Sequence, residues 1–168
     1  MKLSGEFLKN GLFILAFLAV SFAIAKFRGS DHGQAPSWSG YQLVNGASAA
    51  NIADNKSAVV YFWATWCGVC KTNLPLVKWY ASLLEDSQNI VFFSVEEGEN
   101  PAELQQYLKD NNVTFPVVVG NGNTMEDWKV SGYPTFIFVD ESGLVRYADS
   151  GIVNPVSFAL RLLFLRFF

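Results

Sequence analysis

Both cysteines of this 168-residue chain lie in one short segment, Trp66-Cys67-Gly68-Val69-Cys70. A disulfide between residues this close in sequence restrains little of the chain, and its loop entropy gives only about 2 kcal/mol of stabilisation. A purely structural role is therefore a weak explanation for the pair. A C-x-x-C pair beside a strand–helix pattern is instead typical of a disulfide that opens and closes as its chemistry.

The segments on either side of the cysteines supply that setting. An uninterrupted apolar run from Ala58 to Ala64 predicts a strand that is covered on both faces. Apolar residues at helical spacing from Lys71 to Leu84 predict the helix that follows. Cys67 would then stand at the N-terminus of this helix, where backbone N–H groups and the helix dipole favour a thiolate. We therefore expect Cys67 to be the nucleophile and Cys70, one helical turn later, to be the resolving thiol.

The rest of the chain predicts an alternating α/β order. A second buried strand is expected at Ile90–Val95, and Asn100-Pro101-Ala102-Glu103 has the residues of a helix start. A β-hairpin with strands at Thr135–Val139 and Leu144–Ala148 follows, and a helix at Asn154–Phe168 closes the chain. Right-handed crossovers would make the first half a parallel βαβ unit, to which the hairpin adds antiparallel strands. A short apolar run and a helical turn lie between the halves, at Phe115–Val119 and Met125–Val130.

Composition narrows the functional classes. The net charge is −3 and the chain has no basic run, so we expect no nucleic-acid partner. Hydrophobic residues make up 51% of the chain and charged residues 16%, which suffices for a full core and also indicates a membrane segment.

The first 28 residues predict a membrane anchor. The uncharged run from Asn10 to Ala25 would cover about 24 Å as a helix, somewhat less than a hydrocarbon core of about 30 Å. We favour a retained single-pass anchor over residues 1–28, because apolar residues persist along the run and Lys26 and Arg28 follow directly. The alternatives are a signal peptide that is cleaved after Ala23-Ile24-Ala25 and a buried core helix. The retained anchor and the cleaved signal peptide both place the cysteines outside the cytoplasm.

A linker is expected between the anchor and the folded domain. Residues 29–38 are rich in Gly, Ser, Asp, Gln and Pro, which leaves residues 39–168 as the domain. The only histidine, His32, lies in this linker and is expected to be solvated. Structural zinc normally takes four ligands, so a metal site at Cys67 and Cys70 is the weaker alternative. We expect no metal and no cofactor other than the redox-active disulfide itself.

Four segments carry a family resemblance: Phe62–Cys70, Leu74-Pro75, Phe115-Pro116-Val117 and Gly132-Tyr133-Pro134-Thr135-Phe136. Together they resemble membrane-anchored bacterial thioredoxin-like proteins of the TlpA/ResA type. Within that group, the chain most resembles the suppressor-of-copper-sensitivity D proteins. The resemblance covers about Ser39 to Phe168. It implies a thioredoxin-like α/β fold, with a central mixed sheet flanked by helices, behind an N-terminal transmembrane helix.

The resemblance also implies a function. It implies a protein-disulfide oxidoreductase that is anchored in the bacterial inner membrane by a single pass and has its catalytic domain in the periplasm. Protein thiols and disulfides would be its substrates, and a membrane protein its electron-transfer partner. The bond between Tyr133 and Pro134 would be cis and lie against the cysteines, with the Tyr133 backbone pairing with a substrate strand. Trp66, Gly68 and Val69 would complete the substrate-binding surface.

Three positions depart from the family pattern. Tyr61 stands where cytoplasmic thioredoxins carry a buried Asp, and Asn73 stands where ResA-type proteins of cytochrome c maturation carry a Glu. The dipeptide between the cysteines is Gly68-Val69 rather than Gly-Pro. The direction of electron flow is therefore left open, and a thiol reductase of cytochrome c maturation is an alternative role. Outside the enzyme class, the alternative is a redox-inert binding or chaperone module, or a cysteine pair that holds a metal.

Acidic and aromatic residues near the predicted site complete the expectations. Glu96, Glu97 and Glu99 follow the second strand, where a solvated loop is expected. The alternative is an acidic rim that tunes Cys67 or selects a partner. Trp66 is expected to be exposed, whereas core packing is expected for the aromatic residues of the neighbouring strands, Trp63 and Phe136.

Overall fold

The computed structural model describes residues 10–14, 17, 33–37, 43–44, 55–97 and 100–167. The chain divides into two compact units, Met1–Ser30 and Asp31–Phe168. Residues 10–14 are helical, but most of the expected anchor lies outside the described residues, as do the Ala23-Ile24-Ala25 site, His32 and Glu99. Among the helices that are described, none has the length and apolar character needed to cross a bilayer.

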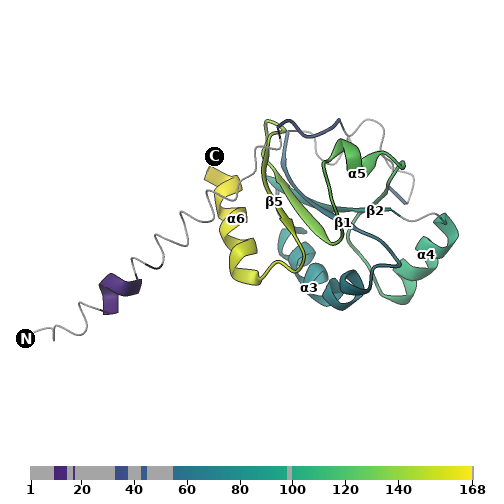
Figure 1. The fold of residues 1–168 in the computed structure, drawn as a ribbon, viewed down its shortest axis with the longest axis horizontal. Coiled ribbons are helices and arrows are strands. Elements are labelled where there is room, and N and C mark those ends of the chain that lie inside the picture. The colour runs from purple at the N-terminus through teal and green to yellow at the C-terminus, as the bar shows by residue number, and fades with distance from the viewer. Residues whose placement is uncertain are drawn as a thin grey trace, which may run out of the picture. The chain divides into compact units, whose positions relative to one another are not determined.

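A five-stranded mixed sheet forms the centre of the second unit, with strand order β3-β2-β1-β4-β5 (Figure 1). The central strand β1 (Ser57–Trp63) runs parallel to β2 (Ile90–Glu96), which runs parallel to β3 (Val117–Val119). On the other side of β1, β4 (Thr135–Val139) is antiparallel to β1, and β5 (Val145–Ser150) is antiparallel to β4. The expected mixed sheet with a C-terminal hairpin is confirmed.

The helices begin close to where the sequence predicts them. In the second unit they are, in chain order, α3 (Gly68–Leu84), α4 (Pro101–Asp110), α5 (Thr124–Asp127) and α6 (Pro155–Phe167). The Asn100 side chain accepts a hydrogen bond from the Ala102 N–H at 3.0 Å, which confirms it as the N-cap of α4. The Asn154 side chain accepts one from the Ser157 N–H at 2.9 Å at the start of α6. Both helices place Pro at the first helical position, as expected.

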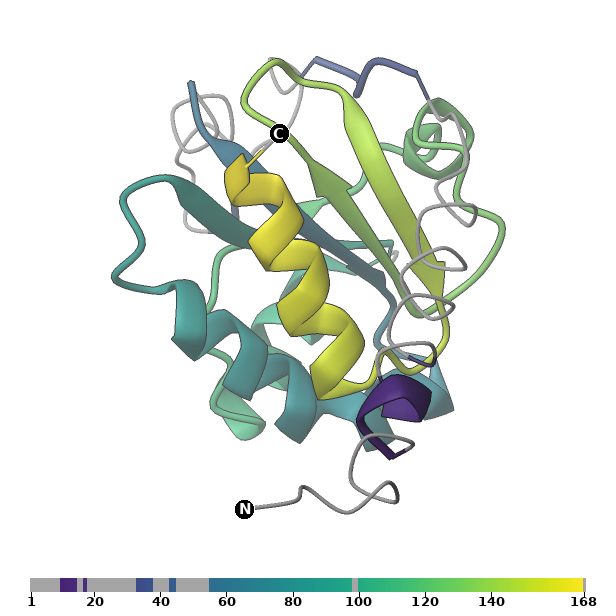
Figure 2. The same ribbon diagram turned by 90° about the vertical axis from the view of Figure 1, so that its left-hand side faces the viewer.

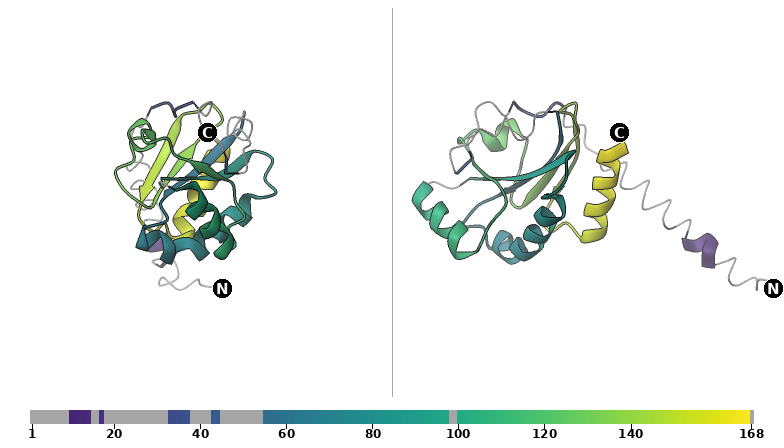
Figure 3. Two further views of the ribbon diagram at one scale, coloured as in Figure 1. Left: turned by 90° about the vertical axis from the view of Figure 1, so that its right-hand side faces the viewer. Right: turned by 180° about the vertical axis from the view of Figure 1, so that it is seen from behind.

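Alternate residues of β1 enter two separate cores, so the strand is buried on both faces. Val59, Tyr61 and Trp63 belong to the core that includes residues of α3 and α6. On the other face, Phe62 packs against Trp128, with ring centroids 5.4 Å apart. Figures 2 and 3 show α3 and α6 on one side of the sheet and α5 on the other. The uniform burial of β1 is what its unbroken apolar sequence predicts.

The parallel strands fix where the chain turns towards the cysteines. The last register pair between β1 and β2 joins Trp63 to Glu96, so both strands end at the same edge of the sheet. The turn from β1 into α3 leaves the sheet at this edge. In open α/β sheets, ligand sites form beyond the carboxyl ends of the strands, which is where the fold places Cys67.

Candidate active site

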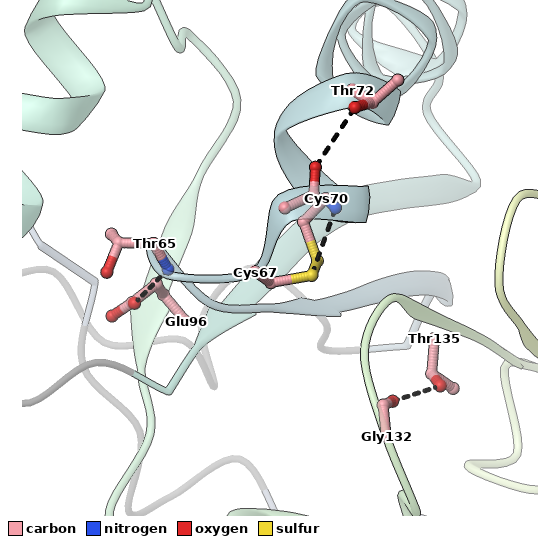
Figure 4. Close-up of a disulfide and its surroundings, with 8 residues drawn as sticks. Thr65, Cys67, Cys70, Thr72, Glu96, Gly132 and Thr135 are labelled. Carbon is pink, nitrogen blue, oxygen red and sulfur yellow. Dashed lines mark hydrogen bonds between the residues drawn. A yellow bond between two sulfur atoms is a disulfide. The ribbon is translucent and has the colours of Figure 1, made fainter.

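Cys67 and Cys70 form a disulfide where β1 gives way to α3 (Figure 4). Their sulfur atoms are 2.08 Å apart and their Cα atoms 5.2 Å apart. Cys67 is 6% exposed and Cys70 2%. The structure thus joins the two cysteines that the sequence singled out, and it leaves little of either residue in contact with solvent.

Cys67 is the N-cap residue of α3. Its Sγ accepts a hydrogen bond from the Cys70 N–H at 3.1 Å, and its carbonyl accepts one from the Lys71 N–H at 3.1 Å. The first turn of α3 contains no acidic residue. After reduction of the disulfide, the N–H groups and the dipole of α3 would stabilise a negative charge on the Cys67 sulfur.

An exposed apolar surface surrounds the buried disulfide. Trp66 is 68% exposed and Val69 50%, and Gly68 between Val69 and Cys67 is exposed as well. A Cβ atom added at Gly68 would meet no other atom within 4 Å, so packing does not require a glycine there. Exposed apolar side chains beside open space suit contact with another polypeptide.

The loop before β4 continues this surface. The bond between Tyr133 and Pro134 is cis, as the family resemblance implied. The Tyr133 ring meets Trp66 edge-on, with ring centroids 5.7 Å apart. The Thr135 hydroxyl donates a hydrogen bond to the Gly132 carbonyl at 2.8 Å and so restrains the loop. The contact between Trp66 and Tyr133 therefore brings the two segments with predicted substrate-contacting residues, 66–69 and 133–134, together.

Two uncharged polar residues occupy the positions where the family resemblance led us to compare carboxylates. Tyr61 of β1 is 1% exposed, and Asn73, one turn along α3 from Cys70, is 3% exposed. Burial raises the pKa of the Tyr61 hydroxyl, and the Asn73 side chain acts in the opposite direction. Tyrosine with a raised pKa is neutral at physiological pH, and asparagine does not ionise. These two positions therefore add no negative charge close to Cys70.

The structure corrects the expectation of a solvated loop for one acidic residue. Glu96 is the last residue of β2 and is only 1% exposed. Its Oε1 accepts a hydrogen bond from the backbone N–H of Thr65 at 3.1 Å (Figure 4). β1 and β2 have seven residues each and pair in parallel along their whole length, so Glu96 pairs with Trp63 and belongs to β2. The expected strand ended one residue earlier, at Val95. An acidic rim near Cys67 was the alternative to a solvated loop, but the hydrogen bond between Glu96 and the Thr65 N–H was not predicted.

Comparison with known proteins identifies the family. Residues 33–148 match the AhpC/TSA family. A thioredoxin-like protein of Haemophilus influenzae is 29% identical over 125 residues, which are 74% of this chain and 72% of that protein. The thiol-disulfide oxidoreductase ResA of Bacillus subtilis is 28% identical over 158 residues, which are 88% of this chain and 86% of that protein.

Solved structures share the fold. A thiol:disulfide interchange protein of the thioredoxin family from Chlorobium tepidum has a TM-score of 0.66 at 24% identity and covers 79% of this chain and 94% of its own. StoA from Bacillus subtilis has a TM-score of 0.62 at 20% identity and covers 76% and 98%. These likenesses support the thioredoxin-like α/β fold. Because the family match covers more than half of its residues, the chain belongs to the AhpC/TSA family of thioredoxin-like proteins.

Proposed function

We propose that this chain is a membrane-anchored thiol–disulfide oxidoreductase of the bacterial periplasm, which exchanges electrons with protein thiols and disulfides through Cys67 and Cys70. One observation carries the proposal: the Cys67–Cys70 disulfide caps α3 next to an exposed Trp66. A disulfide at a helix N-terminus combines a stabilised leaving thiolate with a surface that a protein substrate can contact. The names of the ResA-type relatives support the same activity.

In the reducing direction, the reaction begins with the Cys67 thiolate. It attacks one sulfur of a substrate disulfide, so that a mixed disulfide forms while the substrate S–S bond breaks. The other substrate sulfur leaves as a thiolate and takes up a proton. Cys70 then loses its proton and attacks Cys67, which expels the second substrate sulfur, again with proton uptake. The substrate has gained two electrons and two protons, and the Cys67–Cys70 disulfide has re-formed.

Each such turnover leaves the enzyme oxidised, so a second protein must return the two electrons. In an oxidising compartment, the donor proposed here is a membrane protein with a reactive dithiol. The apolar run Asn10–Ala25 supports an anchor that would keep the domain close to such a donor, and helical residues 10–14 fit it. Oxidation of substrates would follow the same steps in reverse.

Substrate contacts are assigned to the surface around the disulfide. Trp66, Gly68 and Val69 would flank the mixed disulfide, and the loop at Tyr133 and Pro134 would face it from the other side. An extended substrate strand could there pair with the Tyr133 backbone. Within this activity, the resemblance to suppressor-of-copper-sensitivity D proteins favours substrates whose disulfides form under copper stress. Loss of the gene should then change growth on copper, and a Cys67→Ser variant should not restore it.

Insulin reduction with dithiothreitol tests the activity. The wild-type chain should accelerate precipitation of the insulin B chain, and Cys67→Ser should not. A Cys70→Ala variant should accumulate mixed disulfides on Cys67, because the resolving step is lost. Absence of turnover by the wild type with every reductant tried would refute the proposal, and trapping by Cys67→Ala instead of Cys70→Ala would reverse the two roles.

Location needs its own experiment. In cells, the full chain should stay with membranes after carbonate extraction, and a membrane-impermeant maleimide should label its reduced cysteines from outside the inner membrane. Release by carbonate would contradict the anchor, and protection of the thiols in intact spheroplasts would contradict the periplasmic location.

A further inference from the structure

A buried carboxylate contacts the turn that delivers Cys67. Glu96 ends β2 at the edge of the sheet where β1 turns into α3, and 1% of the residue is exposed. Its Oε1 lies 3.1 Å from the Thr65 nitrogen, two residues before Cys67. Figure 4 shows Glu96 and Thr65 on the side of Cys67 that is opposite Cys70.

This contact fixes the path of the turn. The Glu97 N–H donates a hydrogen bond to the Trp63 carbonyl at 3.1 Å, which ends the backbone pairing between the two strands. Two residues after Trp63, the Thr65 N–H donates to the Oε1 atom of the Glu96 side chain rather than to a backbone carbonyl. The Cys67 N–H then donates to the Ala64 carbonyl at 3.1 Å and closes the turn.

Glu96 and its neighbour Glu97 also act electrostatically on the loop before β4. Burial raises the pKa of the Tyr133 hydroxyl, and the charges of Glu97 and then Glu96 raise it further. The Tyr133 ring in turn contacts Trp66, the residue before Cys67. The two segments on either side of Cys67, the turn at Thr65 and the loop at Tyr133, are therefore both linked to Glu96. The N-terminus of α3 acts on Cys67 in the opposite sense to a negative charge, as does Lys71, which is exposed.

We propose that Glu96 is a positioning residue that holds the Thr65–Cys67 turn and, through its negative charge, disfavours the Cys67 thiolate. A less stable thiolate means a less stable reduced form, so the pair gives up its electrons more readily. The strongly oxidising DsbA illustrates the reverse case, in which the reduced form is stabilised. The inference rests on the proposed function and deepens it, because it assigns the direction: Glu96 biases the Cys67–Cys70 pair towards electron donation.

The test compares Glu96→Gln with wild type at redox equilibrium. Glutamine keeps an oxygen acceptor for the Thr65 N–H but removes the charge. The full chain in detergent is equilibrated with a series of reduced and oxidised glutathione, and the dithiol fraction is measured by alkylation. We expect the equilibrium to move about tenfold towards the dithiol in Glu96→Gln, which corresponds to about 30 mV. In a Cys70→Ala background, the pH midpoint for alkylation of Cys67 should fall. Glu126→Gln, at an exposed position on α5, is the matched control and should change neither quantity.

Two results would overturn the inference: an unchanged equilibrium and alkylation midpoint in a folded Glu96→Gln variant, or a shift towards the disulfide. If Glu96→Gln does not fold, Glu97→Gln decides, because Glu97 is half-buried next to Glu96 in the chain and its charge acts on the same tyrosine. A smaller shift towards the dithiol then supports the inference, and no shift overturns it. Insulin turnover plays no part in these readouts, so failure of the proposed function can be told apart from failure of this assignment.

Discussion

The Tyr80 ring stacks on the Phe158 ring, with centroids 3.8 Å apart and planes inclined by 10°. This contact joins α3, which carries the cysteines, to α6 at the C-terminus. The Tyr80 hydroxyl also donates a hydrogen bond of 2.6 Å to the Val153 carbonyl just before α6. Tyr80 and Phe158 are 0% and 1% exposed. The helix that presents the disulfide is thus held against the last helix by both ring stacking and a buried polar contact.

Tyr80→Phe should lower the free energy of unfolding by about 1–3 kcal/mol, because it leaves a buried carbonyl without its donor while the ring stack is kept. Urea unfolding of the oxidised protein at pH 7 measures this loss. Tyr147→Phe is the control, since the half-buried ring of Tyr147 can still pack against Arg161 after the hydroxyl is removed. Equal losses in the two variants would contradict a specific role for the Tyr80 hydroxyl.

Alkaline pH should destabilise the oxidised protein through its buried tyrosines. Burial raises the pKa of Tyr61, Tyr80, Tyr107 and Tyr133 above the ordinary value of 10.0. Because the folded-state pKa exceeds that of the unfolded chain, the neutral form stabilises the fold fully below about pH 10. This contribution is lost as the pH rises through the folded-state values, by up to about 1.4 kcal/mol per pH unit for each tyrosine.

Urea unfolding between pH 8 and pH 11 should show the loss, and Tyr61→Phe should flatten it above pH 10. Tyr61→Phe tests one residue of the set without removing its ring, which lies 4.6 Å from the Phe136 ring. A stability that stays constant up to pH 11 would show that these hydroxyls ionise equally in the folded and unfolded states.

Local signals explain why much of the fold could be predicted from the sequence. The apolar run at Ala58–Ala64 and the capping pattern at Asn100 depend on neighbours in sequence, and both were placed correctly. β3 has only three residues, Val117–Val119, and such a short run becomes a strand only because β2 supplies its hydrogen-bond partners. Length and periodicity cannot reveal such a partner.

The part of the site that was not predicted depends on distant contacts. A glutamate that ends an apolar run is typical of a loop, because an unpaired carboxylate is costly to bury. Glu96 is nevertheless buried, since the Thr65 N–H, 31 residues earlier, donates to it. Likewise, the exposure of Trp66 was expected, but its edge-on contact with Tyr133 depends on how the loop before β4 folds back.

Acid should weaken the β4–β5 hairpin through Asp140. Burial alone would raise the pKa of Asp140, but hydrogen bonds from Ser142, the Leu144 N–H and Arg146 outweigh it and hold the pKa below its usual value. The Leu144 N–H lies 3.0 Å from Oδ1 and the Arg146 Nε 2.5 Å from Oδ2. Because the folded-state pKa is lowered, the carboxylate stabilises the fold above about pH 4, and this contribution is lost as the pH falls further.

Asp140→Asn should therefore cost about 1–3 kcal/mol at pH 7, because one acceptor oxygen and the charge are lost while Ser142 and Arg146 remain. The difference from wild type should shrink between pH 4 and pH 2, where the wild-type carboxylate becomes protonated. Urea unfolding over this range measures it. Asp86→Asn, at an exposed position, is the control and should match wild type at every pH. A pH-independent deficit in Asp140→Asn would mean that the charge contributes nothing.

Trp66 should matter for protein substrates and not for small ones. Its side chain is 68% exposed and meets Tyr133 beside the disulfide, so Trp66→Ala removes apolar surface next to Cys67 at little cost to the fold. We expect kcat/KM for insulin reduction to fall about tenfold, the reaction with glutathione disulfide to stay within about twofold, and the free energy of unfolding to change by no more than about 0.5 kcal/mol. Trp79→Ala, which removes a tryptophan that is 47% exposed further along α3, is the control and should leave both rates unchanged. An equal fall for insulin and glutathione disulfide would mean that Trp66 acts on the reactivity of Cys67 rather than on the binding of the substrate chain.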